Sequence, residues 1–339
     1  FAMHCRKSII KQVMPSNQLP LKLVLLLSLS AALIVLGSIL GSTGIDWHFA
    51  EANRTMLYEI RLPRSIGAFL AGALLGLAGA IAQSLFRNPL ADPYLLGSAS
   101  GALLGVGIIL CLSYAGELSI IALIGINGGA FIGALFGVLA ALLLAGGYKS
   151  SLRLLLSGVV IGVIFGAANS LLTYVRPDLY QSLQSFMLGN TALITWNATL
   201  MMGIALCLCV LLTLLLSPVL SALSLGESTA RTLGLPLDQL RFLLIGVLAL
   251  ATGFAVAQTG LIAFVGLAAP HLVRHISGGR QRAQLLLSTI SGGILLLASD
   301  LLARSLFAPM EIPVGIITAV LGGSYLLFLL RRGQIGMRK

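Results

Sequence analysis

Long apolar runs, separated by short polar, glycine- or proline-containing breaks, follow one another along almost the whole chain. A bilayer core about 30 Å thick is crossed by about 20 apolar residues of α-helix, and runs near that length recur about ten times. They predict membrane-spanning segments at residues 21–41, 62–86, 95–113, 119–146, 152–174, 196–217, 240–258, 260–275, 283–302 and 312–330. The break between the seventh and eighth segments, in the sequence VAQTGLIAF, is the weakest. The pattern predicts an all-α integral membrane protein with its helices in one bundle.

Composition agrees with this fold class. The 339 residues are 58% hydrophobic and only 9% charged, with a mean hydropathy of +1.03. Soluble domains average about 25% charged residues. A water-soluble globular protein is therefore excluded.

The basic residues predict the orientation. With ten crossings both termini lie on one side, and 16 of the 21 Lys and Arg residues fall on that side, against 5 on the other. Positively charged loops stay in the cytoplasm. We expect cytoplasmic tails at 1–20 and 331–339, flanking a single transmembrane domain at 21–330. The net charge of +11 is then explained by topology, without nucleic acid.

Two arginines lie where this rule disfavours them. Arg61 and Arg64 flank Pro63 at the outer start of the second segment. A helix N-terminus carries partial positive charge and disfavours cations. Snorkelling at the interface with Glu59 as a local partner is one explanation. A docking site for an acidic partner outside the membrane is the other, and charge alone does not separate them.

Small residues recur at every fourth position in four segments. The stripes are Ala68–Gly72–Gly76–Ala80, Gly97–Gly101–Gly105, Gly129–Gly133–Gly137 and Gly158–Gly162–Gly166–Ser170. Residues four apart share a helix face, and small side chains let helix backbones approach closely. The stripes predict tight packing and indicate nothing about a substrate.

The sequence lacks the residue patterns that ion coupling, nucleotide binding and metal binding require. All ten acidic residues fall in loops or near segment ends, whereas ion-coupled carriers usually keep ionisable groups within the membrane. The sequence AGGYKSS has a lysine but lacks the glycine that a phosphate-binding loop requires before it. The four cysteines have no metal-ligand spacing, and an interfacial role suits His271 and His275 better than a metal pair. An ion-coupled secondary transporter and an integral-membrane enzyme are both disfavoured, so energy for pumping would come from a partner.

The largest internal cytoplasmic stretch is 217–241. Glu227 and Arg231 form an i,i+4 pair in the favourable order. Gly234 and Pro236 end that short helix, and Asp238 is placed to cap the next segment. The stretch is either a structured loop or a docking element, and a short capped helix favours docking of an ATPase.

Four sequence blocks together resemble one family. They are EIRLPRSIGAFLAGALLGLAGAIAQSLFRNPLADPYLLGSASGALLG (59–105), SLGESTARTLG (224–234), GLIAFVGLAAPHLVRHISGG (260–279) and SDLLARSLFAPMEIPVGIITAVLGG (299–323). The chain is similar, from about residue 20 to its end, to FecCD/BtuC-type permeases. These are membrane subunits of bacterial type II ABC importers for iron–siderophores, haem and vitamin B12.

The resemblance implies partners and site residues. It implies ten helices per subunit and a second permease subunit, most simply in a homodimer. It also implies two cytoplasmic ATPases that hold ATP and Mg, so that this chain carries no cofactor. A periplasmic binding protein would dock through its glutamates. The implied docking residues are Arg61, Arg64 and Arg304; Asp300, four residues before Arg304, lies on the same helix face. The implied ATPase-coupling residues are Leu225, Gly226, Glu227, Ala230, Arg231, Leu233 and Gly234.

The resemblance also implies a gate and a path. The cytoplasmic gate maps onto Asn88 and Leu90 and onto Ser150 and Ser151, where YKSSLR diverges from the usual pattern. For Asn88, capping beside Pro89 is an equal alternative. The helices at 95–113, 152–174 and 312–330 are expected near the path, and Asn169, Ser170 and Thr173 either line it or bridge helices. The sequence PHLVRHISGGRQR favours an iron chelate over vitamin B12, with oxyanions such as molybdate also open.

Overall fold

The computed structural model describes residues 19–41, 44–45, 55–114, 119–147, 151–224, 226 and 236–331. Apart from the two-residue strands β1 (Leu40–Gly41) and β2 (Gly44–Ile45), which pair antiparallel, the described elements are helical, as the sequence predicted. The α-helices are α2 (Leu19–Ile39), α3 (Leu62–Phe86), α4 (Ser98–Tyr114), α5 (Ser119–Leu144), α6 (Ser151–Val175), α7 (Tyr180–Leu188), α8 (Trp196–Leu215), α9 (Ser217–Ser224), α11 (Leu237–Thr259), α12 (Val265–Val273), α13 (Gln281–Ser305) and α14 (Val314–Arg331). Short helical turns cover Met56–Arg61, Pro93–Leu96 and Pro177–Leu179.

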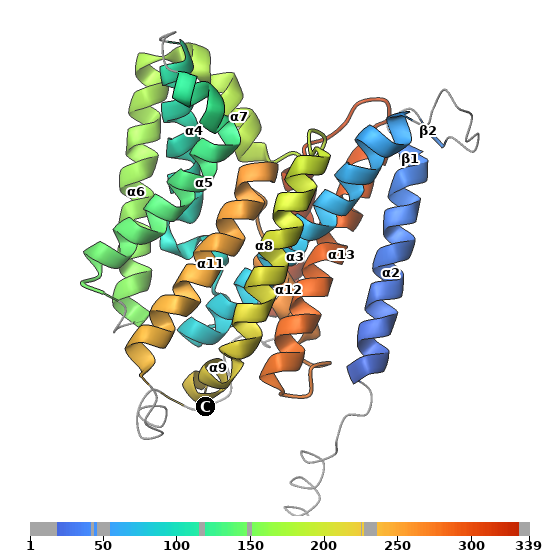
Figure 1. Ribbon diagram of the computed structural model, residues 1–339, viewed down its shortest axis with the longest axis vertical. Coiled ribbons are helices and arrows are strands. Elements are labelled where there is room, and N and C mark those ends of the chain that lie inside the picture. Colours follow the sequence, from blue (N-terminus) through green and yellow to red (C-terminus); the bar gives the residue numbers. More distant parts are fainter. Residues whose placement is uncertain are drawn as a thin grey trace, which may run out of the picture.

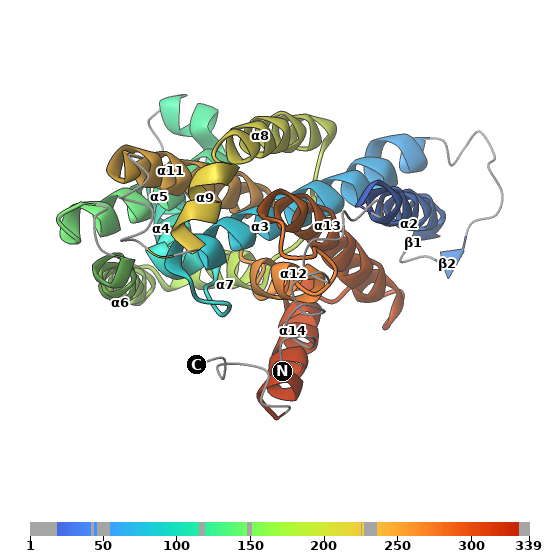
Figure 2. The same ribbon diagram turned by 90° about the horizontal axis from the view of Figure 1, so that it is seen from below.

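The bundle is built around α3, which runs diagonally through its centre (Figure 1). Most α3 side chains are buried, against α13, α11, α12 and α8. The helix α2 lies at one edge, and none of its apolar side chains is buried, as in a lipid-facing helix. Seen from below, α14 projects from one side of the bundle and α8 lies on the opposite side (Figure 2).

Most predicted spans correspond to single helices. Among the described residues, seven helices are long and apolar enough to cross a bilayer, and the apolar helices Ser98–Ser113 and Val314–Leu329 are shorter. The break between the seventh and eighth segments is real, because Gly260 ends α11 with φ 69°.

The eighth segment is not the continuous spanning helix that the sequence predicted. Helix α12 has nine residues, which cover only about 14 Å of the bilayer. The chain nevertheless returns across the bundle between α11 and α13, which both begin at its lower edge (Figure 1). Residues 260–264, before α12, are not helical.

Helix α7, which the sequence did not predict as a separate element, supports this irregular segment. The Leu261 amide donates to the Phe186 carbonyl at 3.1 Å, and the Asn190 amide donates to the Thr259 carbonyl at 2.7 Å. Irregular backbone is tolerated at membrane depth where protein satisfies its hydrogen bonds. The end of α7 therefore permits the interruption before α12.

The small-residue stripes do bring helices together. A Cβ on Gly101 of α4 would collide with the Gly133 carbonyl of α5, and one on Gly72 of α3 would collide with the Gly292 carbonyl of α13. In α6 only Gly158 makes such an approach, to the Leu95 carbonyl. The stripe prediction is thus confirmed for α3, α4 and α5 and holds for only one end of α6.

Candidate functional site

Arg64, at the start of α3, and Arg304, near the end of α13, meet within a buried polar network. Arg64 donates from Nε and Nη2 to Asp300 Oδ1, at 3.1 and 3.0 Å. Its Nη1 donates to both carboxylate oxygens of Glu311, at 3.0 and 2.9 Å. Arg304 pairs with Asp300 Oδ2, and Thr191 Oγ1 donates to Asp300 Oδ1 at 2.6 Å. Asp300 is therefore the centre that joins α3, α13 and the loop after α7.

The network is almost closed to solvent. Asp300 is 0% exposed, Arg304 1% and Arg64 7%. Only the Glu311 side chain, 30% exposed, reaches the surface appreciably. Buried charges persist where each is paired and hydrogen-bonded, and these two arginines and two carboxylates neutralise one another.

Arg61 lies beside the network, where α2 ends. Its Nη1 donates to the Ile39 carbonyl at 3.1 Å, and its side chain is 8% exposed. The guanidinium passes so close to Gly41 that a Cβ there would stand 2.8 Å from Cζ. Arg304 Nη1 also reaches this end of α2, at the Gly37 carbonyl, 2.9 Å away. Both arginines thus fasten α2 to the bundle.

These contacts change the explanation of the charges. The sequence suggested that their counter-charge lies on another protein, but the structure pairs Arg64 and Arg304 with carboxylates of the same chain. The expected contact between Asp300 and Arg304 is confirmed. Glu311 was missed, although its place a few residues beyond α13 puts it at the same edge as Asp300. Docking at the three arginines stays a prediction.

The predicted gate loop follows α3. Asn88 Oδ1 accepts a hydrogen bond from the Leu90 amide at 2.9 Å, which holds a turn in the loop; the residue that caps the end of α3 is Arg87. Asn88 is exposed and Leu90 half-buried. Ser151 is the first residue of α6, and Ser150 lies outside the described residues. The gate assignment therefore stays a prediction.

Asp92 stabilises the helical turn that follows the predicted gate loop. Its Oδ1 accepts from the Tyr94 amide at 2.8 Å, which caps the turn Pro93–Leu96. Burial raises the pKa of the Asp92 carboxyl to about 6, and the hydrogen bond from the Tyr94 backbone offsets part of that shift. Burial, followed by the charge of Asp92, raises the pKa of the Tyr94 phenol. The sequence indicated no such buried acid in this loop.

The predicted coupling element lies largely outside the described residues. Of its seven residues only Gly226 is described, with φ 119° and its amide donating to the Leu223 carbonyl at 3.2 Å. Helix α9 precedes it and was not predicted. Asp238 does not cap α11, because the cap residue is Pro236 and Asp238 lies in the first turn.

The three predicted path residues bond within α6. Asn169 Nδ2 donates to the Phe165 carbonyl, Ser170 Oγ to Gly166 and Thr173 Oγ1 to Asn169. Asn169 is buried, with its Oδ1 3.4 Å from where a Cβ on Gly107 of α4 would lie. Ser170 is exposed. Asn169 therefore faces α4, and the assignment of the three residues to a path stays a prediction.

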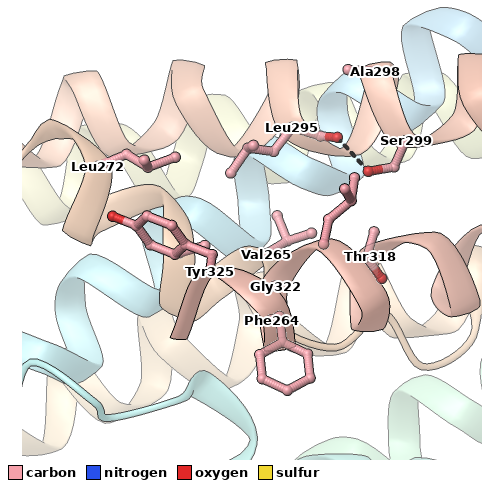
Figure 3. A pocket seen from close by; sticks show the side chains of 11 residues that line it. Phe264, Val265, Leu272, Leu295, Ala298, Ser299, Thr318, Gly322 and Tyr325 are labelled. Carbon is pink, nitrogen blue, oxygen red and sulfur yellow. Dashed lines mark hydrogen bonds between the residues drawn. The ribbon is translucent and has the colours of Figure 1, made fainter. Parts of the chain in front are cut away.

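An apolar pocket that the sequence did not predict opens between α12, α13 and α14 (Figure 3). It measures about 250 Å³, and Val265, Leu295 and Tyr325 are among its lining residues. Ser299, also in its wall, donates its hydroxyl proton to the Leu295 carbonyl of its own helix. Phe264 has φ 68° and passes so close to Gly322 that a Cβ there would collide with it. Glycine at that position lets α14 approach the turn before α12.

Comparisons with known proteins place these features in context. The sequence model of the FecCD transport family matches residues 21–332. The hemin transport system permease protein HmuU of Yersinia pestis is 38% identical over 328 residues, 95% of this chain and 97% of that protein. The vitamin B12 import system permease protein BtuC of Citrobacter koseri is 38% identical over 292 residues, 85% of this chain and 86% of that protein.

Solved structures show the same helical arrangement. An inward-facing conformation of a metal-chelate type ABC transporter matches with a TM-score of 0.83 and 31% identity, over 92% of this chain and 99% of that one. PsaBC from Streptococcus pneumoniae, solved in complex with Fab, matches with a TM-score of 0.59 and 17% identity, over 82% and 93% of the two chains. The second likeness concerns the fold alone.

Proposed function

The chain belongs to the FecCD transport family, and from that premise we propose that it is the permease subunit of an ATP-driven importer that carries a metal chelate across the bacterial inner membrane. The observation that carries the proposal is the full-length structural match to a metal-chelate type ABC transporter. The relatives that match most of the chain are permease proteins, so this chain is a multi-pass transport component and not an enzyme.

The proposed mechanism is alternating access without bond chemistry in this chain. Two ATPase subunits bind ATP and Mg below the membrane and move the coupling element at about 224–234. A periplasmic binding protein delivers the chelate from above. The cytoplasmic position of both termini, inferred from the distribution of basic residues, is part of the proposal.

A second copy of the chain is the proposed partner along α14. This helix exposes a row of large apolar side chains, among them Ile316, Val320, Leu321, Leu327 and Phe328. It also stands away from the rest of the bundle (Figure 2). Closed twofold pairing is the commonest way for such a surface to be covered.

Crosslinking tests the pairing. In a background without the four native cysteines, Val320→Cys in native membranes should give a disulfide-linked dimer. Leu208→Cys on α8, which is also exposed but on the opposite side, is the matched control. Equal crosslinking of both variants, or crosslinking of the control alone, would contradict pairing through α14.

The cargo that we propose first is haem. The support is the hemin transport permease, which is 38% identical over nearly its whole length. Iron–siderophores, vitamin B12 and oxyanions such as molybdate are the alternatives to be compared in the same assay.

Uptake measurements test the cargo and the energy source. Cells that carry the whole transport system should accumulate hemin, and loss of this chain should abolish the accumulation. An ATPase partner that binds but does not hydrolyse ATP should abolish it as well. Hemin uptake that survives ATP depletion but collapses with an uncoupler would instead support an ion-coupled carrier.

A further inference from the structure

A second cavity, of about 340 Å³, lies between α5, α8 and α11. Of these helices, α8 lies on the side of the bundle opposite α14 (Figure 2), and none of the residues that line the cavity belongs to α14. The cavity is therefore separate from the surface proposed for pairing. Its volume is at the lower end of the range for ligand sites, about 300–1,000 Å³.

Each of the three helices gives the cavity one amide and, four residues along, one large apolar side chain. The pairs are Asn127 with Phe131, Gln258 with Phe254 and Asn197 with Met201. Residues four apart lie on one face of a helix, about 6 Å apart along its axis. On each helix, the cavity wall therefore changes from polar to apolar within one turn.

The helix ends show which member of each pair lies nearer the membrane surface. Asn197 lies in the first turn of α8, and Gln258 is one residue from the end of α11. Met201 and Phe254 lie one turn further from those ends. The amides therefore border the membrane surface, and the apolar side chains lie one turn deeper in the bilayer.

The amides form an uncharged rim. Asn127 Nδ2 donates to Gln258 Oε1 at 3.0 Å. The Asn197 side chain forms no hydrogen bond with any residue in the part of the chain that the structure describes. Each amide offers both donors and an acceptor. None of the residues that line the cavity is charged.

Two aromatic rings form the deeper wall. The Phe131 and Phe254 centroids are 4.6 Å apart, with the rings tilted by 47°. A Cβ on Gly253 would already stand 3.1 Å from the Phe131 ring. The glycine lets the rings lie against α11, which leaves the space beside Met201 open.

We propose that this cavity holds one phospholipid whose headgroup has no net charge. The amide rim hydrogen-bonds the phosphate and ester oxygens and accepts from the headgroup donors. The acyl chains begin along Phe131, Phe254 and Met201. Without a cationic side chain in the wall, the site gives an anionic headgroup no electrostatic advantage.

The test is lipid retention by the detergent-purified full-length chain, measured by native mass spectrometry. The probe is an equimolar mixture of phosphatidylethanolamine and phosphatidylglycerol. The wild-type protein should retain one phosphatidylethanolamine, and Met201→Trp, which fills the deeper part of the cavity, should lower that retention at least threefold. Leu200→Trp, at the neighbouring exposed position outside the cavity, should behave as wild type.

A second variant guards against misfolding of the first. Asn197→Leu removes an exposed amide and keeps the number of side-chain heavy atoms, and it should lower phosphatidylethanolamine retention with an unchanged melting temperature. Wild-type retention by both Met201→Trp and Asn197→Leu would overturn the proposal. Preferential retention of phosphatidylglycerol by the wild-type protein would overturn it too.

Discussion

Gly79 of α3 and Gly266 of α12 approach so closely that a Cβ on Gly79 would collide with the Gly266 carbonyl. The contact fixes the short helix α12 against the central helix of the bundle. The contact requires glycine at position 79, because the neighbouring atoms are backbone that cannot rotate away.

Gly79→Ala tests this packing. We expect a loss of about 1–3 kcal/mol or more, because the added methyl group forces two backbones apart. Apparent melting temperature in detergent is the measurement. Gly246→Ala in α11 is the matched control, since a Cβ there meets nothing within 4 Å. Alanine in an open helix position should stabilise by roughly 0.5–1 kcal/mol, so equal losses in the two variants would contradict the explanation.

Asp300→Asn tests the buried charge network. Removing the carboxylate leaves Arg64 and Arg304 buried with less counter-charge, and breaking a buried pair costs about 3–5 kcal/mol. Asp178→Asn removes the partner of Arg176 in an exposed pair, where the expected loss is about 0–1 kcal/mol. Thermal unfolding of the two variants side by side measures the difference. Similar losses would mean that burial does not determine the effect.

Glu311→Gln tests whether Arg64 binds a carboxylate of the periplasmic binding protein. Glu311 neutralises Arg64 at the accessible edge of the network and would compete with a carboxylate from a docking protein. We expect the substitution to strengthen binding of the periplasmic protein by up to about fivefold, roughly 1 kcal/mol. Affinity is measured with the permease in nanodiscs. Weaker binding with unchanged stability would instead make Glu311 part of the docking surface.

Asp92→Asn tests a pH dependence. Burial raises the Asp92 pKa from 3.8 to about 6, so between these values the folded state binds more protons than the unfolded state. Stability should therefore fall as pH rises from about 4 to beyond 6, by at most about 3 kcal/mol. Asparagine keeps the acceptor for the Tyr94 amide without the charge. Its melting temperature should vary less between pH 5 and 7, and an unchanged slope would exclude Asp92 as the cause.

The sequence predicted the features that depend on residues close to one another along the chain. The membrane spans follow from local hydropathy, and the approach of Gly101 to Gly133 follows from helical spacing. The interruption before α12 did not follow, because residues 260–275 are as apolar as a continuous helix would be. What permits the interruption is a hydrogen bond from Leu261 to Phe186, and no local pattern encodes that contact.

The polar network shows the same limit. The sequence showed that Arg64 lies at a helix N-terminus, which disfavours a cation. It also showed the i,i+4 spacing of Asp300 and Arg304. The pairing of Arg64 with Asp300 and Glu311 was not visible, since these acids lie 236 and 247 residues further along the chain. Local spacing therefore identified unusual charges but not their partners.

That separation has a consequence for synthesis. The ribosome synthesises α3, with Arg64, long before α13. Six further membrane segments are therefore inserted before the Arg64 guanidinium can pair with Asp300. The charge centre is completed only when Asp300, 236 residues further along the chain, has been synthesised. A nascent chain cut short before residue 300 therefore keeps Arg64 without its buried carboxylate partner.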